Sequence, residues 1–460
     1  MTDTNAASDR YELRERSSKQ LASTNIRDDT ASTKPSRGSN APDEPPRFTI
    51  DLSLPPDQRY QEVCAALKHE MLNLTRLFDK VVGDMIHFIP LNWLHFVCKL
   101  FLRRIYTNEE NGELKGISRA TGVQMYLLVC FNVLLDLFMG CSSGGAVVDD
   151  DSGGSKMVHF RTLDWGMDSL RKVVVHLDYA AEKDGPIIAS SITYAGFVGT
   201  LTGVRKDLSL SLNFRPNRVD NGNLWADAKY GWHHLMVLLG RRQSISSLLR
   251  QFLLPQSEKK KIISWLPCTK RAAKKFVSYD TIIKLVGGDA DNARPITTTA
   301  CYLCFCNGKE TTTIEKDRVS AVTRSSSDFI VVTNSDESDS PNDAAAKANS
   351  TPAIPNAALQ EIVAEAKDRT ECARNNWNNL RVRKMKDQPD IEAADSQSIC
   401  TVDDVVELVQ KYPTTNECTH YACVMDPAEG TIAWCRQWMK PVCAKWIRAH
   451  MSETWMPAVS

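Results

Sequence analysis

The sequence predicts an α+β fold in which helical segments precede and separate two batches of strands. Apolar residues recur at helical spacing before residue 140, whereas short alternating runs typical of strands follow Cys141 and return after residue 298. The chain has 460 residues and 42% hydrophobic residues, enough for one large domain with tails or for two or three domains. The spacing of the apolar residues alone does not distinguish a layered sandwich from another α+β fold.

Charge and cysteine content exclude some classes of function. The 56 basic and 56 acidic residues balance, so the composition gives no sign of a nucleic-acid binder. The amino terminus is polar and lacks an apolar signal-type segment, and we therefore interpret the 14 cysteines as reduced thiols of a cytoplasmic protein. No stretch is a convincing membrane span, because residues 123–139 are short and carry Asn132 and Asp136.

The first 140 residues divide into a tail and a helical segment. Residues 1–45 are polar and are expected to be disordered. Alternation from Phe48 to Leu54 predicts a half-buried strand, and Pro55-Pro56-Asp57 starts a helix. Helical pieces then continue to Met139 through a loop at residues 107–116. Residues 85–102 are interpreted as core packing, with a surface that dips into a membrane as the alternative.

The remainder, residues 141–460, is rich in predicted strands. The predicted strands are residues 145–148, 156–160, 173–177, 187–193, a short piece at Gly203, 208–212, 298–306, 328–333, 419–425 and 431–438. The predicted helices are residues 231–254, ending at Pro255, 279–286 and 358–376. A basic stretch at 258–275 is interpreted as a solvated insertion, and residues 335–357 as a mobile low-complexity insertion.

The hairpin after Cys141 predicts a chemical site. Its second strand delivers Arg161 and Asp164 beyond its end, and antiparallel pairing returns both to the neighbourhood of Cys141. No histidine lies close in sequence on the Cys141 side. Cleavage before Cys141 would instead supply its own α-amine, of pKa roughly 7.7–8.0, as the base for the thiol. The alternative interpretation is a buried cysteine beside an Arg–Asp surface pair.

Three motifs carry a resemblance to a known family. Cys141-Ser142-Ser143 followed by Arg161-Thr162-Leu163-Asp164-Trp165-Gly166 resembles the nucleophile region of acid ceramidases and N-acylethanolamine-hydrolysing acid amidases. The stretches at residues 47–56 and 191–203 resemble the amino-terminal segment and the central glycine-rich strands of that family, in the same order. The resemblance implies a four-layer αββα N-terminal-nucleophile hydrolase sandwich. It also implies self-cleavage before Cys141, with residues 46–140 as the small subunit and 141–460 as the catalytic portion.

The resemblance extends the site and marks one departure. Val331 to Asp336 resembles the family's T-N-x-D, which implies an oxyanion role for Asn334, and Arg369 is the best candidate for a family arginine. Phe214 stands where the family usually has a glutamate, and we considered Glu417 as a substitute. Cys301 to Cys306 and Asp149 to Asp151 lack the partners of zinc and calcium sites, and His233, His234 and His420 are interpreted as structural.

The sequence therefore predicts an amide hydrolase that needs no cofactor and no metal. Cys141 would attack, Asp164 would hold its α-amine, Arg161 would position substrate or product, and Asn334 would stabilise the oxyanion. The expected substrate is a lipid amide, first of all ceramide, with an N-acylethanolamine or other linear amide as the alternative. Peripheral membrane contact would suit such a substrate. An uncleaved, catalytically silent member that binds a lipid or a protein is the alternative of another class.

Overall fold

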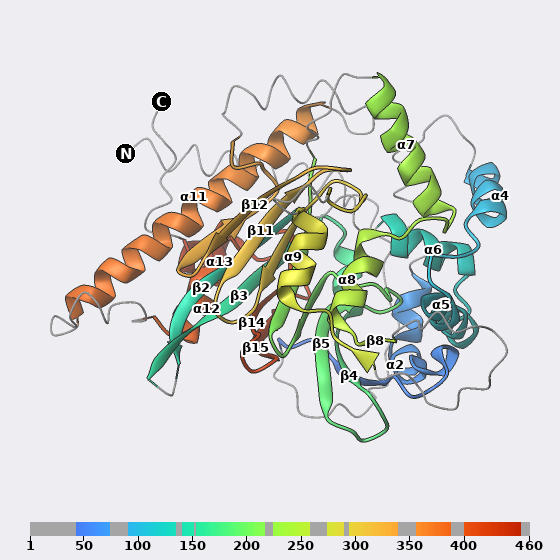
Figure 1. The fold of residues 1–460 in the computed structure, drawn as a ribbon, viewed down its shortest axis with the longest axis horizontal. Coiled ribbons are helices and arrows are strands. Elements are labelled where there is room, and N and C mark those ends of the chain that lie inside the picture. The colour runs from blue at the N-terminus through green and yellow to red at the C-terminus, as the bar shows by residue number, and fades with distance from the viewer. Residues whose placement is uncertain are drawn as a thin grey trace.

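Two β-sheets form the centre of the molecule (Figure 1). The structure, a computed structural model, describes residues 43–73, 91–134, 140–150, 153–216, 224–257, 274–288, 294–338, 356–387 and 400–451. One sheet has eight strands in the order β1-β4-β5-β6-β7-β10-β11-β12, and the other has five in the order β13-β2-β3-β14-β15. Neighbouring strands are antiparallel except for β1, which runs parallel to β4.

The strand bounds show which parts of the chain build each sheet. The eight-stranded sheet consists of β1 (Arg47–Asp51), β4 (Val174–Ala180), β5 (Ile187–Tyr194), β6 (Thr202–Arg205), β7 (Leu208–Phe214), β10 (Cys301–Cys306), β11 (Thr311–Lys316) and β12 (Ala321–Ser326). The five-stranded sheet consists of β2 (Gly140–Asp150), β3 (Gly154–Asp164), β13 (Phe329–Val332), β14 (Thr419–Asp426) and β15 (Thr431–Gln437). A two-stranded ribbon joins β8 (Gln256–Ser257) to β9 (Lys274–Lys275).

Helices cover the outer faces of both sheets. The helices are η1 (Pro56–Gln58), α2 (Gln61–Leu72), α4 (Leu91–Phe101), α5 (Asn108–Thr121), α6 (Met125–Leu134), η3 (Asp168–Val173), α7 (Leu224–Leu238), α8 (Ile245–Leu253), α9 (Tyr279–Gly287), α11 (Asn356–Asp387), α12 (Val402–Gln410) and α13 (Ala444–Ala449).

The resulting layers are those of a sandwich. Helices α8 and α9 pack on β7 and β11, whereas the long α11 and α12 lie against β2 and β3 of the other sheet (Figure 1). The two sheets face each other through β2 and β7 and through β3 and β10. The predicted four-layer αββα architecture is therefore confirmed.

The N-terminal segment is built into this core. Phe48 and Ile50 of β1 are buried, as the alternation predicted, and β1 pairs with β4 from Arg47↔His176 to Asp51↔Ala180. Glu113 of α5 is fully buried between two guanidinium groups, accepting from Arg59 at 2.9 Å and from Arg250 of α8 at 2.7 Å. This ion cluster joins the segment before residue 140 to helix α8, which follows the β2–β3 hairpin in the chain.

Neutralising Glu113 should weaken that attachment strongly. Replacing Glu113→Gln removes the carboxylate on which Arg250 donates and leaves Arg59 only its contact with Glu109, and we expect it to reduce the free energy of unfolding by about 3–5 kcal/mol. Glu109→Gln is the matched control, because Glu109 also contacts Arg59 but its side chain is 55% exposed. Its expected loss is about 0–1 kcal/mol. Urea unfolding of both variants measures the difference, and equal losses would contradict the structural role of the buried cluster.

Some elements differ from the sequence prediction. Residues 107–116, predicted as a loop, begin helix α5, which Thr107 caps by accepting from the Glu110 backbone N–H. Gly116 lies inside this helix because the helix packs closely on the chain at Asp57. A Cβ added at Gly116 would lie 2.2 Å from the Asp57 carbonyl oxygen. The single helix predicted over 231–254 is two helices, α7 and α8, with Gly240 at φ 61° between them. Strands β11 and β12 and helix α12 were not predicted.

The core-packing interpretation of residues 85–102 is wrong for the outer face of α4. Trp93 and Phe96 are 62% and 64% exposed, and Leu100 and Phe101 are also exposed. Among the described residues, no helix combines the length and the apolarity needed to cross a bilayer. Residues 1–42, the basic stretch 258–273 and the insertion at 339–355 lie outside the described residues.

Candidate active site

The β2–β3 hairpin brings the predicted cysteine, arginine and aspartate together. Its register pairs Gly140 with Asp164, Cys141 with Leu163 and Ser143 with Arg161. Strand β3 continues to Asp164, so Arg161 and Asp164 lie within the strand rather than beyond its end. Cys141, Arg161 and Asp164 are all buried. The predicted return of these groups to one strand end is confirmed.

Two glycines let β2 pass through a crowded part of the core. A Cβ added at Gly144 would lie 2.1 Å from the Ile330 carbonyl oxygen of β13, and one at Gly145 would lie 1.9 Å from Thr311 Oγ1 of the facing sheet. Because no side chain fits at either position, β2 can approach β13 and β11 at the same time. This tight packing places Cys141 directly beside the end of β13.

Asn334 holds the backbone nitrogen of Cys141. It follows β13, whose last residue Val332 pairs with Ser143 of β2. The Asn334 Oδ1 atom accepts from the Cys141 N–H at 2.7 Å, and its Nδ2 atom donates to the Phe214 carbonyl oxygen at 2.7 Å. In the uncleaved chain, the asparagine therefore contacts the nitrogen of the Gly140–Cys141 peptide bond.

Arg369 of α11 joins the site from the outer helical layer. Its Nη1 atom donates to Asp164 Oδ2 at 3.0 Å and to Ser142 Oγ at 3.2 Å. Its Nη2 atom donates to Asn334 Oδ1 at 2.9 Å. All five residues singled out from the sequence thus meet in one place, with Arg369 linking Asp164 to Asn334.

Arg161 points between the two sheets. Its guanidinium donates to Ser143 Oγ at 3.0 Å, to Thr202 Oγ1 at 3.2 Å and to the Leu212 carbonyl oxygen at 2.8 Å, and it also contacts Asn213. The Cys141 Sγ atom lies 4.0 Å from the same Leu212 oxygen. The guanidinium therefore places a fixed positive charge beside the thiol.

Burial keeps the thiol protonated in this uncleaved state. It raises the pKa of the Cys141 thiol above its usual value, against the opposing attraction of Arg161 and Arg369. A thiol with a raised pKa needs a base before it can attack a carbonyl group.

Asp164 contacts side chains that the sequence did not single out. Thr419 donates to its Oδ1 at 2.6 Å, and Asn416 donates to its Oδ2 at 3.3 Å. Burial raises the pKa of the Asp164 carboxyl, and Arg369 opposes that shift. In the uncleaved chain the Cys141 N–H donates to Asn334, and Asp164 accepts from Arg369; the role of Asp164 toward a free α-amine stays a prediction. The predicted hairpin beginning at Thr419 was the only available signal for this contact.

Phe214, which stands where the related proteins usually have a glutamate, contacts the site through its backbone. The Phe214 carbonyl oxygen accepts from Asn334, so this position still contacts the site without a carboxylate. From the turn that carries Glu417, the contact to Asp164 comes from Asn416 instead. The Glu417 carbonyl oxygen accepts from Arg171 at 2.6 Å.

A buried histidine in the same inter-sheet layer makes stability depend on pH. His159 lies between Ser209 Oγ and Ser211 Oγ, each 2.9 Å from a ring nitrogen, and burial lowers its pKa to about 3. Below pH 6.5 the unfolded chain binds a proton that the folded chain excludes. Stability is therefore complete above pH 6.5 and falls as the pH drops towards 3, by about 2 kcal/mol at pH 5 from this residue.

Urea unfolding at pH 7.5 and pH 5 tests this dependence. We expect His159→Gln to lose stability at pH 7.5, because its serine contacts change, but to show a smaller loss between the two pH values than the unaltered protein. His69→Gln, at an exposed position, should keep the full pH dependence. An unchanged pH dependence in His159→Gln would contradict the assignment.

The fold and the site fit one expectation from the sequence. Two facing sheets lie between helical layers, with a cysteine at the start of an inner strand beside an arginine, an aspartate and an asparagine, as the resemblance to N-terminal-nucleophile hydrolases implies. His420, which contacts Tyr194 and the Trp165 carbonyl oxygen, and His233, which contacts Arg242, have the structural roles expected of them.

Comparisons with known proteins show which families this chain is similar to. The model of the beta subunit of N-acylethanolamine-hydrolyzing acid amidase matches residues 43–106. The N-acylethanolamine-hydrolyzing acid amidase of Caenorhabditis elegans is 33% identical over 38% of this chain and 50% of its own length. The acid ceramidase of Homo sapiens is 29% identical over 40% of this chain and 49% of its own length.

A solved structure of the Caenorhabditis elegans ortholog superimposes with a TM-score of 0.41 and 18% identity, over 65% of this chain and all of that one. The chain spans about half the length of the curated relatives it matches. Over these stretches the chain is similar to acid ceramidases and N-acylethanolamine-hydrolysing acid amidases.

Proposed function

We propose that this protein is a self-processing cysteine amidase that hydrolyses the N-acyl bond of a lipid amide. The observation that carries the proposal is the hydrogen bond between Asn334 and the Cys141 nitrogen, within the network that joins Asn334, Arg369 and Asp164. The nitrogen in this contact belongs to the Gly140–Cys141 peptide bond, and cleavage of that bond would turn Cys141 into an amino-terminal residue. It also fits the matches to hydrolases of lipid amides.

Self-cleavage would be the first reaction. The Cys141 thiol attacks the Gly140 carbonyl carbon, the peptide C–N bond breaks, and the thiol proton passes to the departing nitrogen. Water then hydrolyses the thioester between Gly140 and Cys141, which releases the Gly140 carboxylate and the Cys141 thiol. Asn334 remains placed to hold the new α-amine through its Oδ1 atom.

Substrate hydrolysis would repeat this chemistry on a bound amide. The α-amine of Cys141 takes the thiol proton, the sulfur attacks the amide carbon, and the protonated amine donates to the leaving nitrogen. Arg161 positions substrate or product near the sulfur. Asn334 donates to the oxyanion as well as holding the amine. Water then releases the fatty acid.

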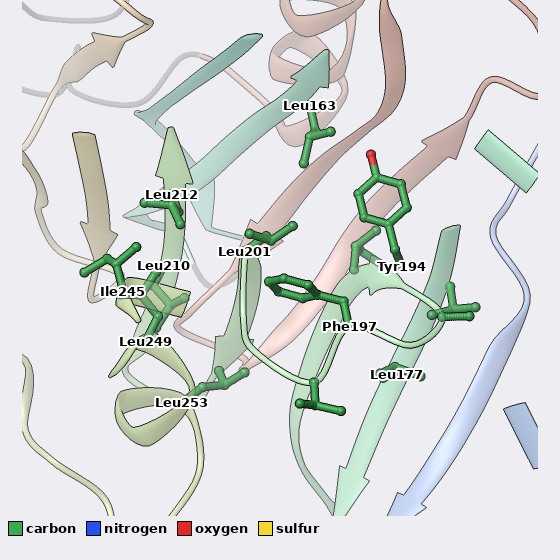
Figure 2. Packing of buried hydrophobic residues seen from close by; sticks show 14 of the residues in the cluster. Leu163, Leu177, Tyr194, Phe197, Leu201, Leu210, Leu212, Ile245, Leu249 and Leu253 are labelled. Atoms are coloured by element: carbon green, nitrogen blue, oxygen red, sulfur yellow. The ribbon is translucent and has the colours of Figure 1, made fainter. Parts of the chain in front are cut away.

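Apolar side chains beside the cysteine support a lipid acyl group. Cys141 belongs to the large buried cluster that contains Leu163, Leu201 and Phe197, and Figure 2 shows these three side chains together with Tyr194. Leu163 is the strand partner of Cys141. An acyl chain entering next to the sulfur would therefore meet apolar side chains as well as the Arg161 guanidinium.

Mass measurement tests the proposed processing, and product analysis tests the substrate. We expect the purified protein to yield two fragments that separate between Gly140 and Cys141. Fatty acid released from ceramide should exceed that from an N-acylethanolamine, and the reverse order would assign the alternative substrate. A single intact chain after long incubation at both acid and neutral pH would instead favour the silent member of the family that Phe214 suggests.

We also propose that the apolar faces of α4 and α7 contact a membrane surface. Trp93 and Phe96 of α4, and Trp225 and Trp232 of α7, are 55–78% exposed. Both helices lie on one side of the molecule and pack near α6, which α4 contacts through His95 and Tyr126 at 2.7 Å (Figure 1). Helix α6 ends six residues before Gly140 in the chain. Aromatic side chains of this kind favour the lipid–water interface.

Vesicle sedimentation tests the membrane contact. With phosphatidylcholine vesicles, we expect the unaltered protein to sediment and the double variant Trp225→Ser/Trp232→Ser to bind at least about tenfold more weakly, because each buried indole contributes on the order of 1–2 kcal/mol. Ile187→Ser is the control, since Ile187 is 44% exposed but lies on β5 outside this face. Equal sedimentation of the double variant and the unaltered protein would exclude these helices as the contact surface.

A further inference from the structure

Two cysteines face each other across the C-terminal hairpin. Cys423 of β14 and Cys435 of β15 are direct register partners. The Trp438 N–H donates to the His420 carbonyl oxygen at 2.9 Å, which makes His420 and Trp438 a hydrogen-bonded pair. Hydrogen-bonded and non-hydrogen-bonded pairs alternate along an antiparallel ladder, so Cys423 and Cys435, three pairs further on, form a non-hydrogen-bonded pair.

This kind of pair has the spacing of a disulfide. Directly opposite residues at non-hydrogen-bonded positions have Cα atoms about 4.5 Å apart, within the range of about 4.4–6.8 Å that disulfides span. Both side chains lie on the face that packs against the large core cluster, so they point to the same side of the sheet. The bulge of this hairpin lies between Val424 and Met425 and leaves the Cys423–Cys435 register intact.

We propose that Cys423 and Cys435 are the site of a cross-strand disulfide, formed when the chain folds in the presence of a disulfide oxidant such as oxidised glutathione. Among the described strands, β15 lies at the edge of its sheet and pairs with β14 alone, so the bond would join it covalently to the sheet that carries Cys141. On β14, Thr419 contacts Asp164 and Cys423 is the register partner of Arg161. The bond would therefore brace the strand next to the candidate site. This proposal does not rest on the proposed function.

The reaction is a thiol–disulfide exchange in two steps. The Cys435 thiolate, which is the less buried of the two, attacks oxidised glutathione, forms a mixed disulfide and releases one glutathione thiol. The Cys423 thiolate then attacks the Cys435 sulfur, closes the protein disulfide and releases the second glutathione thiol. Two protein thiols are oxidised, one glutathione disulfide is reduced, and the two protons pass to the glutathione sulfurs.

Burial determines when the bond can form. It raises the pKa of the Cys423 thiol to about 12 and also raises the pKa of Cys435, so both thiols react slowly in the folded protein. Exchange is faster before the hairpin is packed into the core. In a reducing compartment both groups should therefore remain thiols, and in an oxidising one they should pair during folding.

Peptide mapping of the full chain tests the pairing. The protein is unfolded in urea, refolded with either oxidised or reduced glutathione, alkylated and digested without reduction. We expect a linked peptide pair containing Cys423 and Cys435 only in the oxidised sample, and a Tm a few degrees higher than in the reduced sample. Cys304 and Cys306 are the internal controls, because these buried neighbours lie on one strand and cannot bridge each other, and they should be alkylated in both samples.

A variant and a second arm decide the outcome. Cys435→Ser should lack the linked peptide and show the same Tm in both samples. In a second experiment without refolding, the native protein is incubated with oxidised glutathione for a day. We expect the same linkage to form slowly. Alkylated Cys423 and Cys435 in both oxidised arms, or a linkage of either residue to another cysteine, would overturn the proposal.

Discussion

Replacing Cys141→Ala should leave the protein as one uncut chain that releases no fatty acid from a lipid amide. The proposed nucleophile and the proposed base belong to this one residue, so the change removes the thiol and also prevents formation of the α-amine. Acid–base catalysis alone contributes about 10²–10⁴-fold, and we expect a loss of more than about 10³-fold in turnover. Intact mass and fatty-acid release measure the two effects separately.

The fold should tolerate this change, which makes the result interpretable. Cys141 is fully buried, and the loss of one sulfur atom there should cost about 1 kcal/mol. Cys64→Ala is the matched control, because Cys64 is a buried cysteine of α2 away from the hairpin, and it should be cut and should turn over normally. Normal cleavage or normal turnover in Cys141→Ala would reject the proposed mechanism.

The parts of the site that could be predicted are those carried by short-range pairing. Cys141, Arg161 and Asp164 belong to one hairpin, so their meeting follows from local antiparallel pairing. Asn334 and Arg369 lie far along the chain, and only the family resemblance singled them out. The contacts of Asn416 and Thr419 with Asp164, and of Ser142 with Arg369, could not be predicted, because hydroxyl and amide side chains are common and nothing local shows what they reach.

The missed strands have a related explanation. Strand β11 contains Thr311 and Thr313, and β7 contains Ser209 and Ser211, so the layer between the sheets is unusually polar. In β11 this polar composition removes the apolar alternation by which strands are recognised. The alternation of β7 survived because Leu208, Leu210 and Leu212 face the helical side. The polar layer is the same one that holds Arg161 and His159, so the weak strand signal and the candidate site have one physical origin.

Replacing Arg369→Met should destabilise the protein and also slow its cleavage. The change leaves the Asp164 carboxylate, which is only 4% exposed, without its cation, and removes one donor from Asn334 Oδ1. Losing one partner of a buried ion pair costs about 3–5 kcal/mol. Misplacement of Asn334 should slow cleavage at Gly140–Cys141 by about 10²-fold. Urea unfolding in a Cys141→Ala background gives the stability of the uncut chain, and intact mass over time gives the cleavage rate.

The double variant separates charge burial from catalysis. Adding Asp164→Asn to Arg369→Met removes the orphaned carboxylate, so it should recover part of the lost stability, whereas cleavage should stay slow because Asn334 still lacks its guanidinium partner. Arg374→Met is the control, since Arg374 lies on the same helix but its ion pair with Glu337 is solvent-exposed and should contribute only about 0–1 kcal/mol. If Arg369→Met were as stable as Arg374→Met and cut at the normal rate, the link from α11 to the nucleophile would be packing alone. If the double variant regained both stability and cleavage, Arg369 would serve only to neutralise Asp164, and Asn334 would hold its position through the Phe214 carbonyl oxygen.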